Sequence, residues 1–572
     1  MSFARYYQAE LGYLRDMGRA FGESHPGIAG MLAERGGDPD VERLLEGFAF
    51  LSARVRQRID QAMPSLLESL TELLLPQLVQ PLPAATIVQF SPTPRTLRGR
   101  QHVAAGTMLA AKPRDGTACL FRTAEDVDLV PASITAQRLD DTHPARPRIV
   151  LTLQIAKGGH EAVFAGGLRL HLHGELALTS QLCLWLTRHC RSVTLSAGEQ
   201  TLTVPATSVH HHGLDGALWP WPRFAPAALR LLTEYHTLPS KFLFVTLTGI
   251  EGAARFSGET VQLTFELERP PRLPGPLPQE TFRLHCVPAV NLFDVDADPV
   301  RWDALSRPRL LRASGVDPHH VEVHTVREVL GVTPGGRRTY RPFLGFQHQR
   351  GGAEPYYVLT RELSPIDQGV DHYLSLAGPR DRPLADELEP HTLSIAMTCT
   401  HRALPNALGV GDVCVPTPSS PVGVPFRNIG PISRPARPPL GAGSYAPLMA
   451  HLAASRRALT DVDALRALLR LYNFQQHSDH PAGRVNDARI STLAGMREQA
   501  ATRILQGAPV RGSKLTLTAH EDGFLSKGDA FLFASVLDRL FGMQVHVNTF
   551  SQLGITLLPS NDALEWEPRW RS

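Results

Sequence analysis

The chain has 572 residues, of which 43% are hydrophobic and 20% are charged, and its formal net charge is +3. This composition excludes an extended disordered chain, and the length predicts several domains. The nearly neutral net charge gives no reason to expect a surface that binds nucleic acid or anionic membranes. The sequence has no run of about 18 apolar residues and no apolar signal segment near its start. We therefore expect a cytosolic protein that does not insert directly into a membrane.

Residues 1–83 predict an N-terminal helical segment. The first helix is expected over residues 3–23, with Tyr7, Leu11, Leu14 and Phe21 near one face. The second begins at the capping residue Asp38 and Pro39, and the third begins near Pro64 and ends before Pro76.

The second predicted helix is apolar over more than one face. Its main stripe has helical spacing and consists of Leu44, Leu45, Phe48, Leu51, Val55 and Ile59, with Val41, Phe50 and Ala53 beside it. Such a helix needs neighbours on more than one side. We therefore predict a partner interface formed by Leu44, Phe48, Leu51, Val55 and Ile59; the alternative is that the whole stripe packs inside this chain.

From about residue 84 the hydrophobic pattern changes to alternation, which predicts strands. In one such strand, Leu168, Leu170 and Leu172 alternate with polar residues, among them His171, which we expect on a solvent-facing side. Further strands are predicted over 149–155, 242–248, 261–267, 321–326 and 393–400. We expect two β-rich modules, 84–270 and 271–415, that meet at the proline-rich stretch 269–276.

Eight prolines between Pro416 and Pro439 exclude a central strand or helix, so residues 416–444 are predicted to form an extended crossing segment. Residues 445–572 then predict a small α+β module. Its expected elements are a helix over 462–471 capped by Thr460 and Asp463, strands over 514–517 and 544–547, and a helix over 529–541. The fold class is therefore predicted as multidomain α+β.

The helix over 529–541 has more apolar residues than one small sheet can cover. Phe531, Phe533, Leu537 and Leu540 are therefore predicted to contact another subunit, either a second copy of this chain or a neighbouring assembly.

Two motifs raise the possibility of a metal site. His210, His211 and His212 are consecutive, but alternate residues of a strand point to opposite faces and no carboxylate or cysteine stands beside them at ligand spacing, so we predict a polar loop. Asp294, Asp296 and Asp298 open like a calcium-binding loop. Pro299 stands where that loop needs glycine, and Leu305 stands where it needs glutamate, so we predict a polar turn at a strand end.

The remaining candidates for chemistry are weaker. The six cysteines form no CxxC pair and are predicted to be buried thiols. Trp219-Pro220-Trp221-Pro222 suggests a carbohydrate platform, although packing at a module boundary is favoured. Nucleotide-binding, zinc-protease and serine-hydrolase motifs are absent from the sequence. We therefore predict no catalytic residue, no metal, no cofactor and no enzyme activity.

Short segments along the whole chain are typical of one protein family and stand in its order. They are Phe3–Arg15, Asp40–Leu51, Leu231–His236, Pro239–Phe244, Asn291–Phe293, Tyr340–Phe343, Cys399–Pro405, Arg437–Leu440, Leu468–Tyr472, Phe531–Arg539, Asn548–Leu553 and Trp566–Arg569. Together they resemble the TssF family, also called VasA or ImpG, of baseplate subunits of the bacterial type VI secretion system.

The resemblance implies a structural wedge component that assembles with a TssG-like subunit, commonly with two TssF copies to one TssG, and with TssK and TssE. Such wedges surround a VgrG hub and carry the contractile sheath, in the bacterial cytoplasm and docked at the inner face of the cell envelope through the assembled complex. On the residues alone, the competing prediction is a multidomain β-rich hydrolase or carbohydrate-binding protein. Stoichiometric co-purification with partner subunits, rather than turnover of a substrate, discriminates the two.

Overall fold

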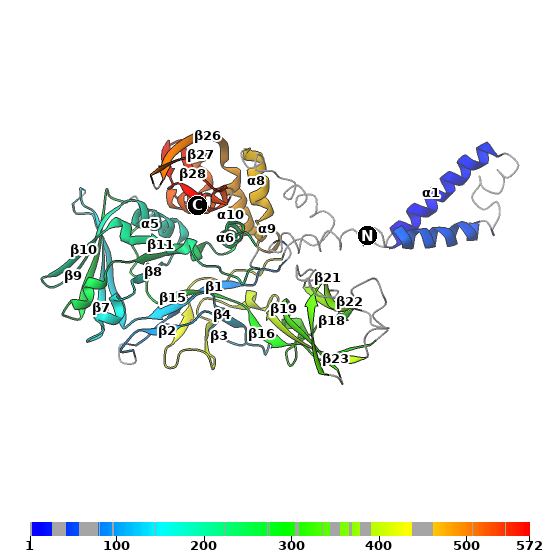
Figure 1. The fold of residues 1–572 in the computed structure, drawn as a ribbon, viewed down its shortest axis with the longest axis horizontal. Helices are drawn as coiled ribbons and strands as arrows, with labels where there is room; N and C mark the ends of the chain where they lie inside the picture. Colours follow the sequence, from blue (N-terminus) through cyan, green and yellow to red (C-terminus); the bar gives the residue numbers. More distant parts are fainter. Residues whose placement is uncertain are drawn as a thin grey trace. The chain divides into compact units, whose positions relative to one another are not determined.

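The computed structural model divides the chain into two units, one formed by Met1–Leu75 with Gly441–Ala446 and the other by Pro76–Leu440 with Pro447–Ser572. The structure describes residues 3–25, 40, 42–56, 78, 80–93, 97–143, 145–222, 225–271, 273, 275–303, 308–333, 336–343, 355–364, 369–377, 390–437, 461–505, 507–543 and 545–571. The described part of the first unit is helical, and the second unit combines sheets with helices (Figure 1). The predicted multidomain α+β class is confirmed.

The first unit contains α1 (Phe3–Ser24) and a second helix over residues 42–56 (Figure 1). Both follow the predicted positions, because their apolar residues recur at helical spacing. The predicted capping residues Asp38 and Pro39, and the third predicted helix, lie outside the described residues.

The second unit contains a six-stranded antiparallel sheet that gathers distant parts of the sequence. In spatial order its strands are β24 (Val413–Pro416), β3 (Met108–Ala111), β4 (Leu120–Thr123), β15 (Cys286–Val290), β1 (Ala85–Phe90) and β25 (Phe426–Asn428). The proline-rich segment begins at the end of one edge strand, β24, and contains the other, β25. Proline has no backbone N–H, and an edge strand tolerates this loss. The Asn428 side chain ties the two edges together, since its Oδ1 accepts hydrogen bonds from the N–H groups of Gly411 and Val413, both at 2.9 Å.

Two further antiparallel sheets lie in the same unit. The five-stranded sheet consists of β10 (Gln200–Pro205), β9 (Cys190–Ala197), β13 (Thr260–Leu267), β7 (Arg148–Ile155) and β6 (Ala132–Asp140). The four-stranded sheet consists of β11 (Val209–His211), β12 (Phe244–Leu247), β8 (Leu168–Leu172) and β14 (Phe282–Arg283), and a separate ribbon pairs β2 (Gln101–Val103) with β5 (Val127–Leu129). The helices here are α4 (His160–Phe164), α5 (Leu176–Arg188) and α6 (Ala227–Thr237).

An eight-stranded sheet follows the chain order only in part. Its strands are β16 (Phe293–Asp296), β17 (Val300–Trp302), β18 (Arg309–Leu310), β19 (Glu322–Thr333), β20 (Gly336–Pro342), β21 (Tyr356–Leu363), β22 (Val370–Ala377) and β23 (His391–Thr400). Buried Val329, Leu393, Ile395 and Met397 belong to its core. The strands predicted over 321–326 and 393–400 are confirmed here, and β19 extends beyond its predicted end.

The C-terminal part carries a βαβ unit. Its elements are α8 (Val462–Leu471), α9 (Gln475–Ser478), α10 (His480–Ser491), β26 (Leu493–Leu505), β27 (Ala508–His520), α11 (Lys527–Gly542), β28 (Thr549–Leu558), β29 (Asp562–Glu565) and β30 (Arg569–Arg571). β27 and β28 are parallel, so the chain must cross from one end of the sheet to the other, and α11 lies in this crossover.

Two predictions in the C-terminal part are wrong in detail. The strand predicted over 544–547 starts instead at Thr549, directly after Asn548, whose φ of +59° belongs to a turn. The predicted helix over 462–471 is confirmed, but its cap is Asp461, whose carboxylate accepts a hydrogen bond from the N–H of Ala464 at 3.1 Å.

The prediction that His171 faces solvent is also wrong. β8 is an inner strand of its sheet, and His171 is 2% exposed, with its ring 4.5 Å from the ring of Phe244 on β12. Burial, with a smaller contribution from His173, lowers the pKa of His171 from 6.5 to about 3. The imidazole is therefore neutral in the folded chain near neutral pH.

His171 should make the folded chain sensitive to mild acid. Its folded pKa lies below its unfolded pKa, so the unfolded chain takes up the proton first, and stability falls as the pH falls below about 6.5. Between pH 7.5 and 5.5 this single group removes about 1.4 kcal/mol. His171→Phe should reduce the pH dependence of urea unfolding by that amount. A pH dependence identical to that of the unsubstituted chain would contradict this assignment.

Candidate assembly surfaces

Polar contacts fix how the two N-terminal helices pair. Arg15 on α1 forms an ion pair with Glu42. Toward the other end of the pair, Glu10 accepts hydrogen bonds from Ser52 Oγ at 3.0 Å and from Arg56 at 2.5 Å. Low residue numbers on α1 thus meet high residue numbers on the second helix, so the helices run antiparallel.

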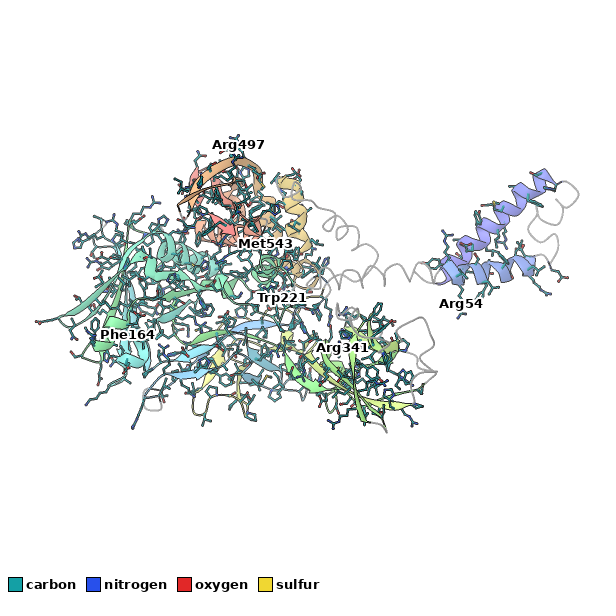
Figure 2. The ribbon with its side chains drawn as sticks, in the orientation of Figure 1. Arg54, Phe164, Trp221, Arg341, Arg497 and Met543 are labelled. Atoms are coloured by element: carbon teal, nitrogen blue, oxygen red, sulfur yellow. The ribbon has the colours of Figure 1, made fainter. Side chains whose placement is uncertain are left out.

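The predicted interface residues on the second helix are exposed. Leu44 is 74% exposed, Phe48 64%, Leu51 62% and Val55 59%, whereas Ile59 lies outside the described residues. Figure 2 shows the side chains of this helix, with Arg54 labelled near its end. The helix pair itself therefore leaves these four side chains exposed. The partner interface stays a prediction, and so does the alternative that the whole stripe packs inside this chain.

A second exposed stripe, which the sequence analysis missed, lies on α1. Tyr13 is 60% exposed, Met17 52% and Phe21 49%, at the spacing of four that marks one side of a helix. On each helix the exposed stripe is rotated by roughly a quarter to a third of a turn from the side that packs on the other helix. Viewed from each helix's own N-terminus, the rotation has the same direction on both. Because the helices run antiparallel, both stripes therefore lie on the same side of the pair.

We call this side the N-terminal apolar face; its residues are Tyr13, Met17, Phe21, Leu44, Phe48, Leu51 and Val55. Single exposed apolar residues are ordinary, but a contiguous group of large ones is typical of a surface that a partner covers. The arrangement suits binding of another apolar helix or helix pair.

The predicted contact residues of the C-terminal module are buried in this chain. Phe531, Phe533, Leu537 and Leu540 are each 0–2% exposed. α11 packs against β28 and also against α5 and α6 from the middle of the chain. The surplus of apolar residues on α11 was identified correctly, but α5 and α6 cover it, so these four side chains are core residues rather than surface contacts.

Other side chains of this module do reach the surface. Met543 is 42% exposed, Val547 63% and Trp570 41%, and Met543 is labelled in Figure 2. Trp570 on β30 pairs with Phe550 on β28, close in sequence to Val547. A subunit contact by this module stays a prediction, and these residues are among the exposed apolar side chains available for it.

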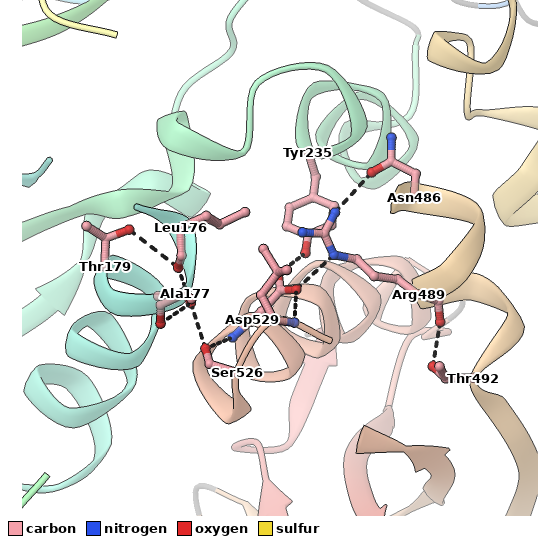
Figure 3. A network of polar contacts seen from close by, with 11 residues as sticks. Leu176, Ala177, Thr179, Tyr235, Asn486, Arg489, Thr492, Ser526 and Asp529 are labelled. Atoms are coloured by element: carbon pink, nitrogen blue, oxygen red, sulfur yellow. Dashed lines mark hydrogen bonds and ion pairs between the residues drawn. The ribbon is translucent and has the colours of Figure 1, made fainter. Parts of the chain in front are cut away.

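A buried polar network joins α11 to α6 and α10 (Figure 3). Asp529 on α11 is fully buried, and its carboxylate accepts hydrogen bonds from Arg489 Nε at 2.9 Å, from Tyr235 Oη at 3.2 Å and from the N–H of Leu525 at 3.2 Å. Arg489 also donates to Asn486 Oδ1 at 3.1 Å. A buried charge is stable only with such partners, so this network favours one docked position of the C-terminal part.

The start of α11 also touches α5 directly. The Gly528 N–H donates to Gln181 Oε1 at 2.9 Å, and the hydroxyls of Ser526 and Ser180 are 3.0 Å apart. A Cβ on Gly528 would lie 2.2 Å from the Ser180 carbonyl. Only glycine allows this approach of the two helices.

A second buried ion pair joins two of the segments that carry the family resemblance, Leu231–His236 and Pro239–Phe244. Lys241 and Glu234, each about 1% exposed or less, are 2.5 Å apart. The other oxygen of Glu234 accepts hydrogen bonds from the Leu218 N–H at 2.9 Å and from Trp221 Nε1 at 2.8 Å. The pair holds the Trp219–Pro222 turn against α6, and Trp219 is only 3% exposed. Trp219 therefore packs inside the chain, which favours the packing role over a carbohydrate platform.

The consecutive histidines lie in separate environments. His210 is 3.0 Å from Thr248 Oγ1, the half-buried His211 is 2.7 Å from the Phe242 carbonyl, and His212 is 3.2 Å from Glu125. They form the end of β11 and the start of a 3-10 turn rather than the predicted loop. Asp294 and Asp296 lie within β16 rather than in a turn. Among the described residues, no three His, Cys, Asp or Glu side chains gather as metal ligands would.

The cysteines are free, and all except Cys414 are buried. Burial raises the pKa values of Cys119, Cys183, Cys286 and Cys399 to about 12, so these side chains remain thiols. Among the helices that the structure describes, none is long and apolar enough to cross a membrane.

Comparisons with known proteins match the chain from end to end. The family model "Type VI secretion system, TssF" matches residues 1–572. A relative from Pseudomonas aeruginosa PAO1, the type VI secretion system component TssF1, is 28% identical over 99% of this chain and 98% of the relative.

Solved structures agree with the sequence matches. A chain from the cryo-electron microscopy structure of a type VI TssK–TssF–TssG baseplate subcomplex has a TM-score of 0.81 and 27% identity, and the match covers 92% of this chain and 98% of that chain. A chain from a type VI baseplate complex has a TM-score of 0.64 and 25% identity over the whole of both chains. The present chain therefore belongs to the TssF family of the type VI secretion system.

Proposed function

We propose that this chain is a structural wedge subunit of the type VI secretion baseplate, which assembles with TssG-like and TssK-like subunits and catalyses no reaction. One observation carries the proposal: the fold matches, over almost its entire length, a chain solved within a TssK–TssF–TssG baseplate subcomplex. A full-length match leaves no additional domain in this chain that would need a separate activity. The competing hydrolase or carbohydrate-binding role has no observation in its favour.

The N-terminal apolar face is the surface that we assign to the TssG-like subunit. It presents seven large apolar side chains on one side of the helix pair, and the described residues of the first unit leave them exposed. Burying a Leu or Phe side chain is worth about 1.5–3 kcal/mol, so even part of this face can supply a stable contact.

Charge on this face should abolish the contact. Phe48→Asp combined with Leu51→Asp places two carboxylates where the partner would bury apolar surface, and stoichiometric co-purification with the TssG-like subunit should be lost. Arg43→Asp is the matched control, because Arg43 lies on the other flank of the same helix and its side chain is 81% exposed. A folded double variant that still binds would refute the assignment.

The other partners follow from the family resemblance and remain proposals. They are TssE in the wedge, the VgrG hub at the centre and a second copy of this chain. We place the assembly in the bacterial cytoplasm, docked at the inner face of the cell envelope through the complete complex.

The C-terminal module is the part that we assign to contacts between copies or between neighbouring wedges. Val547→Asp with Trp570→Asp should leave binding of the TssG-like subunit intact and prevent wedges from joining into complete baseplates. Sheaths that assemble normally in cells carrying this variant would rule the surface out.

A further inference from the structure

A groove of about 860 Å³ lies between α5 and the C-terminal sheet. Leu184 and Trp185 on α5, together with Pro270 and Pro271, form an apolar wall. Three residues of β29 and Lys527 at the start of α11 line it as well. We call it the Trp185 groove; its volume lies within the range of pockets that hold ligands, about 300–1,000 Å³.

The wall of the groove contains an unsatisfied hydrogen-bond donor. Trp185 is 5% exposed, and its Nε1–H has no acceptor among the described residues. His189 and Arg269, which also line the groove, lie against the indole, with the His189 ring 4.6 Å and the Arg269 guanidinium 5.7 Å from its ring centre. A buried N–H without an acceptor is destabilising, and buried indoles usually have a partner. A carbonyl oxygen would satisfy it, but the indole or the groove wall must shift to admit one, because the Nε1 atom itself is buried in the free chain.

The β29 side of the groove carries unsatisfied backbone groups. β29 pairs with β28 on one side, and no other described strand pairs with it. In an antiparallel pair, alternate residues direct their N–H and C=O toward the partner strand, so the other residues of β29 direct theirs to the free edge. Such an edge is a template for an added strand.

We propose that the Trp185 groove binds an extended, mainly apolar peptide segment of another baseplate subunit. The segment adds as a strand to the free edge of β29, and one of its carbonyl groups accepts a hydrogen bond from Trp185 Nε1. The apolar wall selects apolar side chains, while Lys527 is already paired with Asp562 and needs no acidic partner. This inference rests on the proposed function, because the segment comes from the assembled wedge.

Hydrogen exchange on the assembled wedge tests the proposal. The full chain is measured alone and in complex with the TssG-like and TssK-like subunits. Those amides of β29 that face its free edge, rather than β28, should be protected only in the complex. Ala563→Arg introduces a long charged side chain at an exposed position in the groove and should remove this protection. Ala500→Arg makes the same change at an exposed position on the opposite edge strand, β26, and should leave it intact. Trp185→Phe keeps an aromatic ring but removes the N–H, and should weaken the protected state about fivefold.

The outcomes separate this inference from the proposed function. Failure of the three proteins to co-elute would overturn the proposed function and this inference with it. Co-elution with unprotected β29 amides, or protection that persists in Ala563→Arg, would overturn the inference alone. Protection that grows with the concentration of the isolated chain would identify a second copy as the occupant, and would likewise overturn it.

Discussion

Replacing Arg489 with methionine is expected to loosen the C-terminal part of the chain from α6, with a loss of about 3–5 kcal/mol in the free energy of unfolding. Arg489 is 2% exposed and Asp529 is fully buried, so the substitution leaves a carboxylate in the interior without its guanidinium. Hydrogen exchange of α10 and α11, and urea unfolding, should both report the change.

Two controls make this result specific to the buried pair. Arg470 and Asp487 also form an ion pair, at 2.7 Å, but both side chains are about half exposed, so Arg470→Met should change stability by no more than about 1 kcal/mol. The double change Arg489→Met with Asp529→Leu removes both charges and should be less harmful than Arg489→Met alone. Equal effects of Arg489→Met and Arg470→Met would show that the network does not hold the module.

Gly528→Ala should separate α11 from α5. The added Cβ would lie 2.2 Å from the Ser180 carbonyl carbon and oxygen. Backbone atoms of a packed helix cannot move aside to relieve this clash, as the end of a flexible side chain can. The helices must move apart, which should reduce the free energy of unfolding by at least about 1–3 kcal/mol and expose the buried side of α11.

Gly495→Ala is the matched control for this substitution. Gly495 lies in the same part of the chain, and no atom stands within 4 Å of the position that its Cβ would occupy. Its stability should therefore change little. If the Gly528→Ala chain unfolds at the same urea concentration as the Gly495→Ala chain, the close contact between α11 and α5 does not exist as described.

Local features of this fold were predictable because their causes lie within a few residues. The alternation of Leu168, Leu170 and Leu172 located β8 at its observed bounds, and helical spacing located Val462–Leu471. The environment of the same elements was not predictable. His171 is buried because β12 packs beside it, and the pairing of β15 with β1 joins residues about 200 positions apart.

For the candidate surfaces, too, local character was predictable from the sequence and the environment was not. The sequence showed that residues 42–56 and α11 carry more apolar side chains than one neighbour can cover. Only tertiary packing decides which of these side chains are buried by other parts of the chain. α5 and α6 cover α11, whereas Phe48 and Leu51 remain exposed. On α1, Phe21 was assigned to the same face as Leu11, yet Leu11 is buried and Phe21 is 49% exposed, because the direction of the neighbouring helix selects the packed side.

Co-expression of the chain with the TssG-like and TssK-like subunits of the same organism tests the central claim most directly. The tagged chain is purified, and the mass and composition of the complex are measured by size-exclusion chromatography with light scattering. The proposed role predicts one complex of fixed stoichiometry that contains all three proteins, and loss of the TssG-like subunit when Phe48 and Leu51 are replaced with Asp. A chain that elutes alone as a stable monomer while the other two subunits are present would contradict it.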